Sequence, residues 1–182
     1  HDRSGAVVGI LNGIDTELFD PAADHKITRR FNSQTVVEGK RENKQAMQRA
    51  PGMAESDAPV FVSIGRLAEQ KGYNLVAAVI PEIIEAGGQV LILGTGKPEI
   101  EAALREAMKP YPGKAVLIPR FDAALAQQMY AGGDFFLMPS KFEPCGLGQM
   151  IAMRYGTLPI VRRTGGLKDT VVDLDASRAG TG

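Results

Sequence analysis

Short apolar runs alternate with amphipathic stretches along most of this chain. The apolar runs predict buried strands at residues 60–64, 89–93, 115–118, 135–138 and 158–161. Helical patterns lie between and after them, at residues 73–86, 98–108, 123–130 and 148–155, with one more after Gly166. This alternation predicts the α/β class: a Rossmann-like, doubly wound parallel sheet with helices on both faces.

The remaining elements follow less regular patterns. Residues 6–11 form an apolar run that predicts a strand, which Asn12-Gly13 should stop. Residues 39–49 are polar with a basic bias and predict a solvated surface helix. Pro81 lies inside a helical pattern and is expected to kink or divide that helix.

Length and composition exclude several classes of protein. The 182 residues suffice for one well-buried domain and are marginal for two. The 21 basic and 21 acidic residues balance, so charge does not favour nucleic acid or an anionic membrane as a partner. No charge-free apolar run approaches the ~20 residues of a membrane span. A single cysteine excludes an intrachain disulfide and fits a reducing compartment.

The stretch from residue 135 to 170 holds two consecutive strand–loop–helix units. The first loop carries Glu143 and two glycines, Gly146 and Gly148, and the second is Thr164-Gly165-Gly166. Amides at helix N-termini suit anionic or hydroxyl-rich ligands. Loops that follow parallel strands meet at the edge of the sheet where ligands bind.

This stretch resembles the donor-binding signature of bacterial glycogen synthases and plant starch synthases. The resemblance rests on EPCGLGQ at residues 143–149 and AMRYGTLPIVRRTGGLKDTV at residues 152–171. It extends to NGID at 12–15, GK..NK at 39–44 and GRL..QKG at 65–72. Members of this family are retaining glucosyltransferases that build α-1,4-glucan from ADP-glucose.

The resemblance implies a GT-B enzyme, which has two Rossmann-like domains with the active site between them. Residues 1–182 then correspond to the C-terminal, nucleotide-sugar-binding domain. Both ends are interpreted as cuts through a larger protein, with the N-terminal domain, which makes most contacts to the acceptor glucan, missing. The chain alone is expected to hold the donor without transferring glucose.

The predicted catalytic residues are Glu143, Arg66 and Lys71. Arg66 and Lys71 lie five positions apart in a loop after a strand, and read alone they could be two surface cations. The resemblance implies that they bind the donor diphosphate. Read alone, Glu143 could be a solvated loop residue; the resemblance implies that it faces the sugar. Other retaining enzymes of this fold often have a second glutamate eight positions later, where this chain has Ile151.

The other predicted donor contacts come mainly from the resemblance. It places Phe121, otherwise a candidate for core packing, against the nucleotide base. It implies that the Thr164 loop faces the glucose and phosphates, and that backbone amides of the first loop bind the hexose hydroxyls. The predicted donor-binding residues are Phe121, Cys145, Gly146, Leu147, Thr164, Gly165, Gly166 and Gly94.

Gly94 begins a Gly-Thr-Gly turn after a strand, which would bring backbone close to a ligand or simply form a tight turn. The full dinucleotide fingerprint requires a glycine where this chain has Glu99, so a dehydrogenase is the least favoured class.

No metal and no cofactor are predicted, with ADP-glucose as a substrate. Two histidines and one cysteine at unrelated spacing do not predict a metal site, and Cys145 lacks the Cys–His pattern of a nucleophile. The family implies a bacterial cytoplasm or a plastid stroma. Two alternatives stay open: a nucleotide-sugar-binding module without catalysis, and another retaining GT-B transferase.

Overall fold

The computed structural model describes residues 9–175 and 180–182. Within them, five parallel strands form one sheet in the order β3-β2-β1-β4-β5. The strands are β1 (Val60–Ile64), β2 (Gln89–Leu93), β3 (Ala115–Ile118), β4 (Phe135–Met138) and β5 (Leu158–Val161), all at their predicted ranges. The strand order reverses between β1 and β4. In sheets of this kind, ligands bind beyond the carboxyl ends of the strands at such a reversal.

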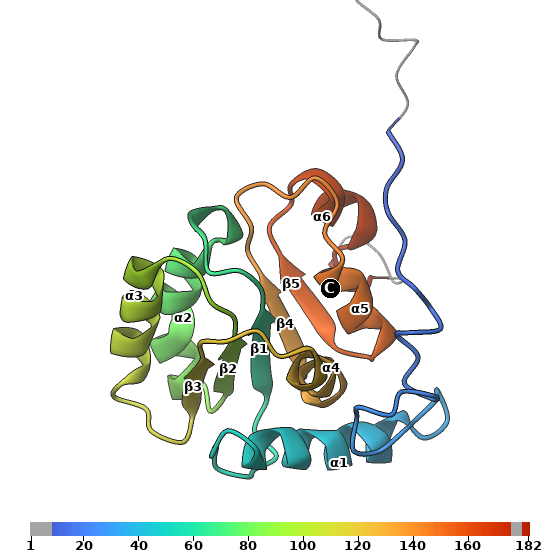
Figure 1. Cartoon of the computed structure of the whole chain (residues 1–182), viewed down its shortest axis with the longest axis horizontal. Helices are drawn as coiled ribbons and strands as arrows, with labels where there is room; N and C mark the ends of the chain where they lie inside the picture. The colour runs from blue at the N-terminus through green and yellow to red at the C-terminus, as the bar shows by residue number, and fades with distance from the viewer. Residues whose placement is uncertain (1–8, 176–179) are drawn as a thin grey trace, which may run out of the picture.

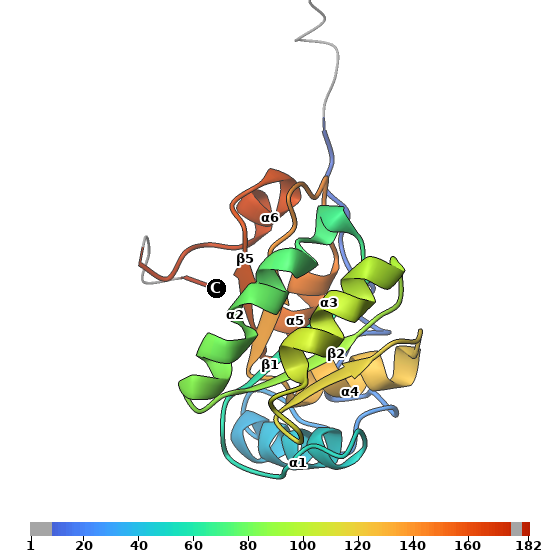
Figure 2. The ribbon, with the colours of Figure 1, turned by 90° about the vertical axis from the view of Figure 1, so that its left-hand side faces the viewer.

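Helices cover both faces of the sheet, which confirms the doubly wound prediction. Helices α2 (Tyr73–Glu85) and α3 (Pro98–Met108) lie together on one face (Figures 1 and 2). On the other face lie α1 (Val36–Arg49), α4 (Ala123–Gly132) and α5 (Gly148–Arg154), while α6 (Gly165–Thr170) lies beyond the carboxyl end of β5. A short 3-10 helix spans Glu69–Lys71.

Alternation of side chains along the strands builds two cores. Val60 and Val62 of β1 pack on the α4 side, whereas Phe61 packs on the α2 side. Every residue of β2 is buried, as expected for a strand with helices on both faces. The two cores pack against both faces of the strands, so the positions at which the following loops begin are fixed.

The structure corrects two sequence predictions about local structure, the first in full and the second in part. Residues 9–11 form no strand, because Ile10 is 89% exposed and pairs with no neighbouring strand; residues 6–8 lie outside the described part. Pro81 does not divide α2, which runs unbroken through it. Val76, Ile80 and Ile84 are buried along one side of α2, and this burial outweighs the backbone bond that proline removes.

The prediction of a solvated surface helix is also wrong for one face of α1. Asn43, Met47 and Gln48 are buried, and α1 begins at Val36. The Asn43 side chain accepts hydrogen bonds from the amides of Thr28 and Arg29 and donates to the Arg29 carbonyl. The polar residues on the buried face of this helix therefore make hydrogen bonds inside the protein. Among the described helices, none is long and apolar enough to cross a membrane.

Candidate functional site

The predicted site residues follow the carboxyl ends of all five described strands. Arg66 follows β1, Gly94 follows β2, Phe121 follows β3, Glu143 follows β4 and Thr164 follows β5. Since the strands are parallel, these loops share one edge of the sheet. In the structure, some of the predicted residues line a hollow, and others gather around Glu143.

A hollow of ≈ 230 Å³ brings together Arg66, Gly94 and Phe121. The Phe121 side chain is 87% exposed, which rules out the core-packing alternative. Among the described residues, the guanidinium of Arg66 has no hydrogen-bond or ion-pair partner. An unpaired cation and an exposed aromatic ring therefore border the same space.

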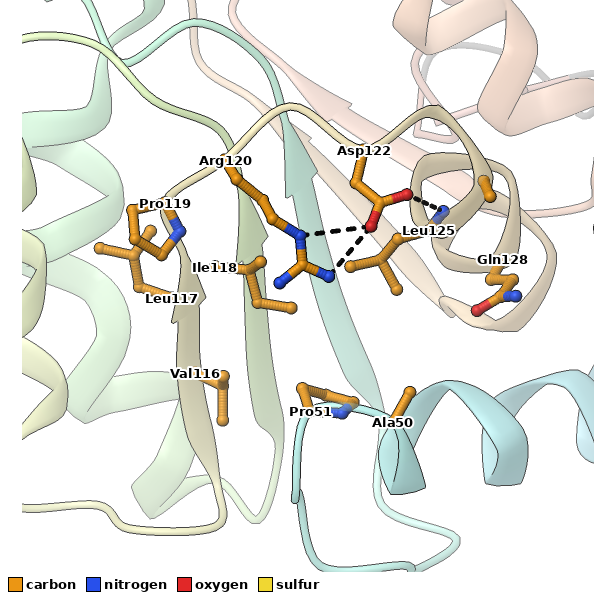
Figure 3. A pocket seen from close by; sticks show the side chains of 11 residues that line it. Ala50, Pro51, Val116, Leu117, Ile118, Pro119, Arg120, Asp122, Leu125 and Gln128 are labelled. Atoms are coloured by element: carbon orange, nitrogen blue, oxygen red, sulfur yellow. Dashed lines mark hydrogen bonds and ion pairs between the residues drawn. The ribbon is translucent and has the colours of Figure 1, made fainter.

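The residues on either side of Phe121 fix its loop (Figure 3). The Arg120 guanidinium donates to one carboxylate oxygen of Asp122, with Nη2 at 3.0 Å. The other oxygen accepts from the Leu125 amide at 3.0 Å and caps α4. These contacts, the Leu125 amide first and Arg120 second, hold the pKa of Asp122 below its ordinary value. The hollow of ≈ 440 Å³ drawn in Figure 3 lies beside this pair.

Gly94 is required by the approach of two strand-end loops. A Cβ at this position would overlap the carbonyl oxygen of Gly65. The Leu67 amide donates to the Thr95 carbonyl at 3.0 Å, which ties the same two loops together. Gly94 thus allows its loop to lie directly against the backbone at Gly65. Both glycines line the hollow.

Glu143 and Lys71 form an ion pair beyond the carboxyl ends of β1 and β4. Lys71 Nζ lies 2.5 Å from Glu143 Oε2, and the Ser140 hydroxyl donates to the same oxygen at 3.1 Å. The Glu143 side chain is 10% exposed, so it is not the solvated loop residue of the alternative interpretation. Within the described part of the chain, Oε1 of Glu143 has no hydrogen-bond partner.

Two glycines allow the loop after β5 to press against the loop after β4. We call residues 139–147 the acid loop and residues 162–166 the TGG loop. A Cβ on Gly165 would overlap the Glu143 carbonyl, and one on Gly166 would overlap the Cys145 backbone. The Gly166 amide donates to the Glu143 carbonyl at 2.9 Å. The two loops therefore form one unit.

Three backbone donors of the acid loop have no partner among the described residues. The amides of Cys145, Gly146 and Leu147 donate to no atom of the described residues. The Cys145 thiol instead points to carbonyls, donating to Asn12 at 3.8 Å and to Gly146 at 3.4 Å. Three available amides beside a carboxylate form a surface that matches a hydroxyl-rich ligand.

Thr164 stands at the N-cap position of α6, but its side chain accepts no cap hydrogen bond. The Thr164 carbonyl instead accepts from the amides of Leu167 and Lys168, at 3.1 and 3.3 Å, and these bonds form the first turn of α6.

Sequence reasoning missed residues that support the site. Ser140, Asp122 and Gln149 each contact a predicted residue or its loop. Ser140 had one signal, its place directly after a strand and three positions before Glu143. The described residues contain no group of three or more His, Cys, Asp or Glu side chains placed to hold a metal. Metal-free chemistry stays a prediction.

Comparison with known proteins gives consistent results. The family model of the glycosyl transferases group 1 matches residues 58–178. A glycogen synthase of Anaeromyxobacter sp. is 50% identical over 181 residues, which is 99% of this chain and 38% of that protein. The catalytic domain of starch synthase IV from Arabidopsis thaliana, bound to ADP and acarbose, superposes with a TM-score of 0.90. The two sequences are 42% identical, and the superposed part is 98% of this chain and 37% of the starch synthase chain.

A more distant structure shares the fold. The C-terminal domain of a glycosyl transferase group 1 family protein from Francisella tularensis is 19% identical, with a TM-score of 0.61. The match covers 88% of this chain and 76% of that domain. The chain spans little more than a third of the length of the curated glycogen synthases that it matches.

Proposed function

This chain belongs to the glycosyl transferases group 1 family, and we propose that it is the donor-binding domain of a glucosyltransferase. The whole protein would transfer glucose from ADP-glucose to the non-reducing end of an α-1,4-glucan, with retention and without a metal. The observation that carries the proposal is the joining of the acid loop and the TGG loop. Their unused amides and a buried carboxylate lie in sequences shared with the glycogen synthase signature.

Arg66 and Lys71 would hold the diphosphate of the donor. Both lie on the connection between β1 and α2, at the point where the strand order reverses. Arg66 is exposed and unpaired within the described residues, so its guanidinium is available for two phosphate oxygens. Cations at this position stabilise the negative charge that gathers on a departing nucleotide.

Phe121 would stack on the nucleotide base. Its exposed ring adjoins the hollow that Arg66 and Gly94 also line. The Arg120–Asp122 pair and the cap on α4 hold the loop in place, so little order is lost when a base binds.

Glu143 and the acid-loop amides would hold the hexose. Oε2 of Glu143 is held by Lys71 and Ser140, which leaves Oε1 to accept from a sugar hydroxyl or to oppose positive charge on the ring. The amides of Cys145, Gly146 and Leu147 would donate to other hydroxyls.

The chain by itself is proposed to bind the donor without transferring glucose. It spans 38% of the glycogen synthase from Anaeromyxobacter sp.. The acceptor glucan would bind mostly to the other domain of the whole protein. A bacterial cytoplasm or a plastid stroma stays the predicted location. Another retaining GT-B transferase remains the alternative for the whole protein.

Calorimetric titration with ADP, UDP and NAD tests the proposal. The expected result is binding of ADP, weaker binding of UDP and none of NAD. Arg66→Ala and Lys71→Ala should each weaken ADP binding by about tenfold or more. Lys109→Ala, at the far end of α3, removes a surface cation and serves as the control. If ADP does not bind, or if all three variants bind equally, the proposed donor site is wrong.

Transfer itself is tested in a longer protein that contains this chain. Labelled glucose should pass from ADP-glucose to the end of a maltooligosaccharide, and the product should carry the α configuration. Transfer from another sugar nucleotide in preference to ADP-glucose would favour the alternative transferase.

A further inference from the structure

Gln149 lies beneath the acid loop and contacts it from inside. Its side chain is completely buried at the start of α5. The amide nitrogen, Nε2, lies 3.2 Å from the Cys145 carbonyl, 3.1 Å from the Gly146 carbonyl and 2.9 Å from the Thr170 hydroxyl oxygen. Two hydrogens are therefore shared among three acceptors.

These contacts fix the direction of the acid-loop amides. In a trans peptide the carbonyl and the next N–H point in opposite directions. Because Gln149 draws the carbonyls of Cys145 and Gly146 inward, the N–H groups of Gly146 and Leu147 point outward. These are two of the three amides that donate to no described residue.

Thr170 extends the contact to the TGG loop. Its hydroxyl accepts from Gln149 and donates to the Gly166 carbonyl at 2.6 Å. The Gly166 amide in turn donates to the Glu143 carbonyl. Gln149, Thr170 and Gly166 thus complete a ring of hydrogen bonds that joins both loops.

The other end of the Gln149 amide has no partner. Oε1 is buried and accepts no hydrogen bond, the one such side-chain atom among the described residues. A buried acceptor without a donor lowers stability, so it requires an explanation. An apolar side chain of the same length would avoid this cost, but it would not hold the two carbonyls.

We propose that Gln149 and Thr170 are positioning residues, which orient the acid-loop amides toward the hexose of the donor. The inference rests on the proposed function and deepens it. Neither side chain would touch the donor: Gln149 is wholly buried, and Thr170 is turned toward Gln149 and the Gly166 carbonyl. Their effect reaches the ligand only through the backbone of the two loops.

Titration of two ligands separates this role from a general one. ADP and ADP-glucose are titrated in parallel into the wild type, Gln149→Met, Thr170→Val and Thr170→Ser. In Gln149→Met and Thr170→Val, ADP affinity should stay within about twofold of wild type, because Arg66 and Phe121 are untouched. The additional affinity that the glucose provides should fall by about tenfold, as the amides lose their orientation.

Matched substitutions and thermal unfolding complete the test. Thr170→Ser keeps the hydroxyl and should restore wild-type affinity for ADP-glucose, whereas Thr170→Val has the same shape without it. Gln149→Met removes the unpartnered oxygen but also the donor to three acceptors, so its unfolding temperature should stay within about 5 °C of the wild type.

Several outcomes would overturn the inference. In one, both variants keep the wild-type ratio of the two affinities. In another, ADP and ADP-glucose weaken equally, which indicates general damage. In a third, glucose adds no affinity in the wild type, so the amides do not hold it. Absence of ADP binding to the wild type would instead contradict the proposed function itself.

Discussion

Lys71 and Glu143 lie 72 residues apart in the chain, yet Nζ of the lysine contacts Oε2 of the glutamate at 2.5 Å. One follows β1 and the other follows β4, and the sheet places these strands side by side. The lysine side chain is 25% exposed and the glutamate 10%, so solvent screens the pair only in part. Two of the three predicted catalytic residues are therefore electrostatically coupled before any donor binds.

Glu143→Gln and Lys71→Met should change ADP binding in opposite directions. Lys71→Met removes a cation from the phosphates and should weaken ADP by about tenfold to a hundredfold. Glu143→Gln releases the lysine and removes a negative charge, so ADP should bind as tightly as in the wild type or up to about tenfold tighter. Calorimetry measures both. Equal weakening in the two variants would mean that the ion pair itself builds the nucleotide site.

Phe121→Ala should weaken ADP binding by about tenfold or more, because stacking of a base on an aromatic ring contributes about 1–3 kcal/mol. Phe121→Tyr keeps the ring face and should bind ADP like the wild type. The unfolding temperature should not change in either variant, since the ring is 87% exposed. Fluorescence or calorimetric titration gives the affinities. Unchanged ADP affinity in Phe121→Ala would mean that the nucleotide base does not stack on Phe121.

Gly166→Ala should destabilise the protein by about 1–3 kcal/mol, because its Cβ would overlap the Cys145 backbone. The loops would separate, and binding of ADP-glucose should weaken together with stability. Gly13→Ala is the matched control, since a Cβ there meets no atom within 4 Å. It should change the free energy of unfolding by less than about 0.5 kcal/mol. Urea unfolding measures the stability of both variants. If Gly166→Ala is as stable as Gly13→Ala, the close contact between the two loops does not contribute to the stability of the fold.

Lys40 makes the stability of the fold depend on pH. Its ammonium donates to the carbonyls of Ala131 and Tyr155 and to the Thr157 hydroxyl, at 3.2, 3.2 and 2.9 Å. Burial lowers the pKa of Lys40 from 10.5 to about 8, with Asp134 acting in the opposite direction. Between these two values the unfolded chain holds a proton that the folded chain has released. Stability from this group therefore rises with pH across that window.

Lys40→Met tests that dependence. From about pH 7 to about pH 9.5, the wild type should gain about 2 kcal/mol relative to the variant. Urea unfolding at several pH values measures the difference, and the comparison cancels the contributions of other groups. A constant difference across the window would mean that Lys40 keeps its proton in the folded state.

The pattern of apolar residues was sufficient to predict the strands. Each of the five described strands is a short apolar run between turn residues, and each lies at its predicted range. The same pattern was wrong at residues 9–11, because an apolar run forms a strand only where another strand can pair with it. It was also wrong on α1, where Asn43 and Gln48 are polar but buried, since their hydrogen-bond partners lie in other segments.

By itself, the sequence determined the order of strands and helices, the family, and which loops carry Arg66, Glu143 and the glycines. These features depend on residues close together in the chain. Only the tertiary structure decided that Lys71 pairs with Glu143, that Gln149 holds the acid loop from beneath, and that Gly166 meets the Glu143 carbonyl. Such contacts join distant segments, and they arise because the reversal of strand order brings β1 beside β4 and β4 beside β5.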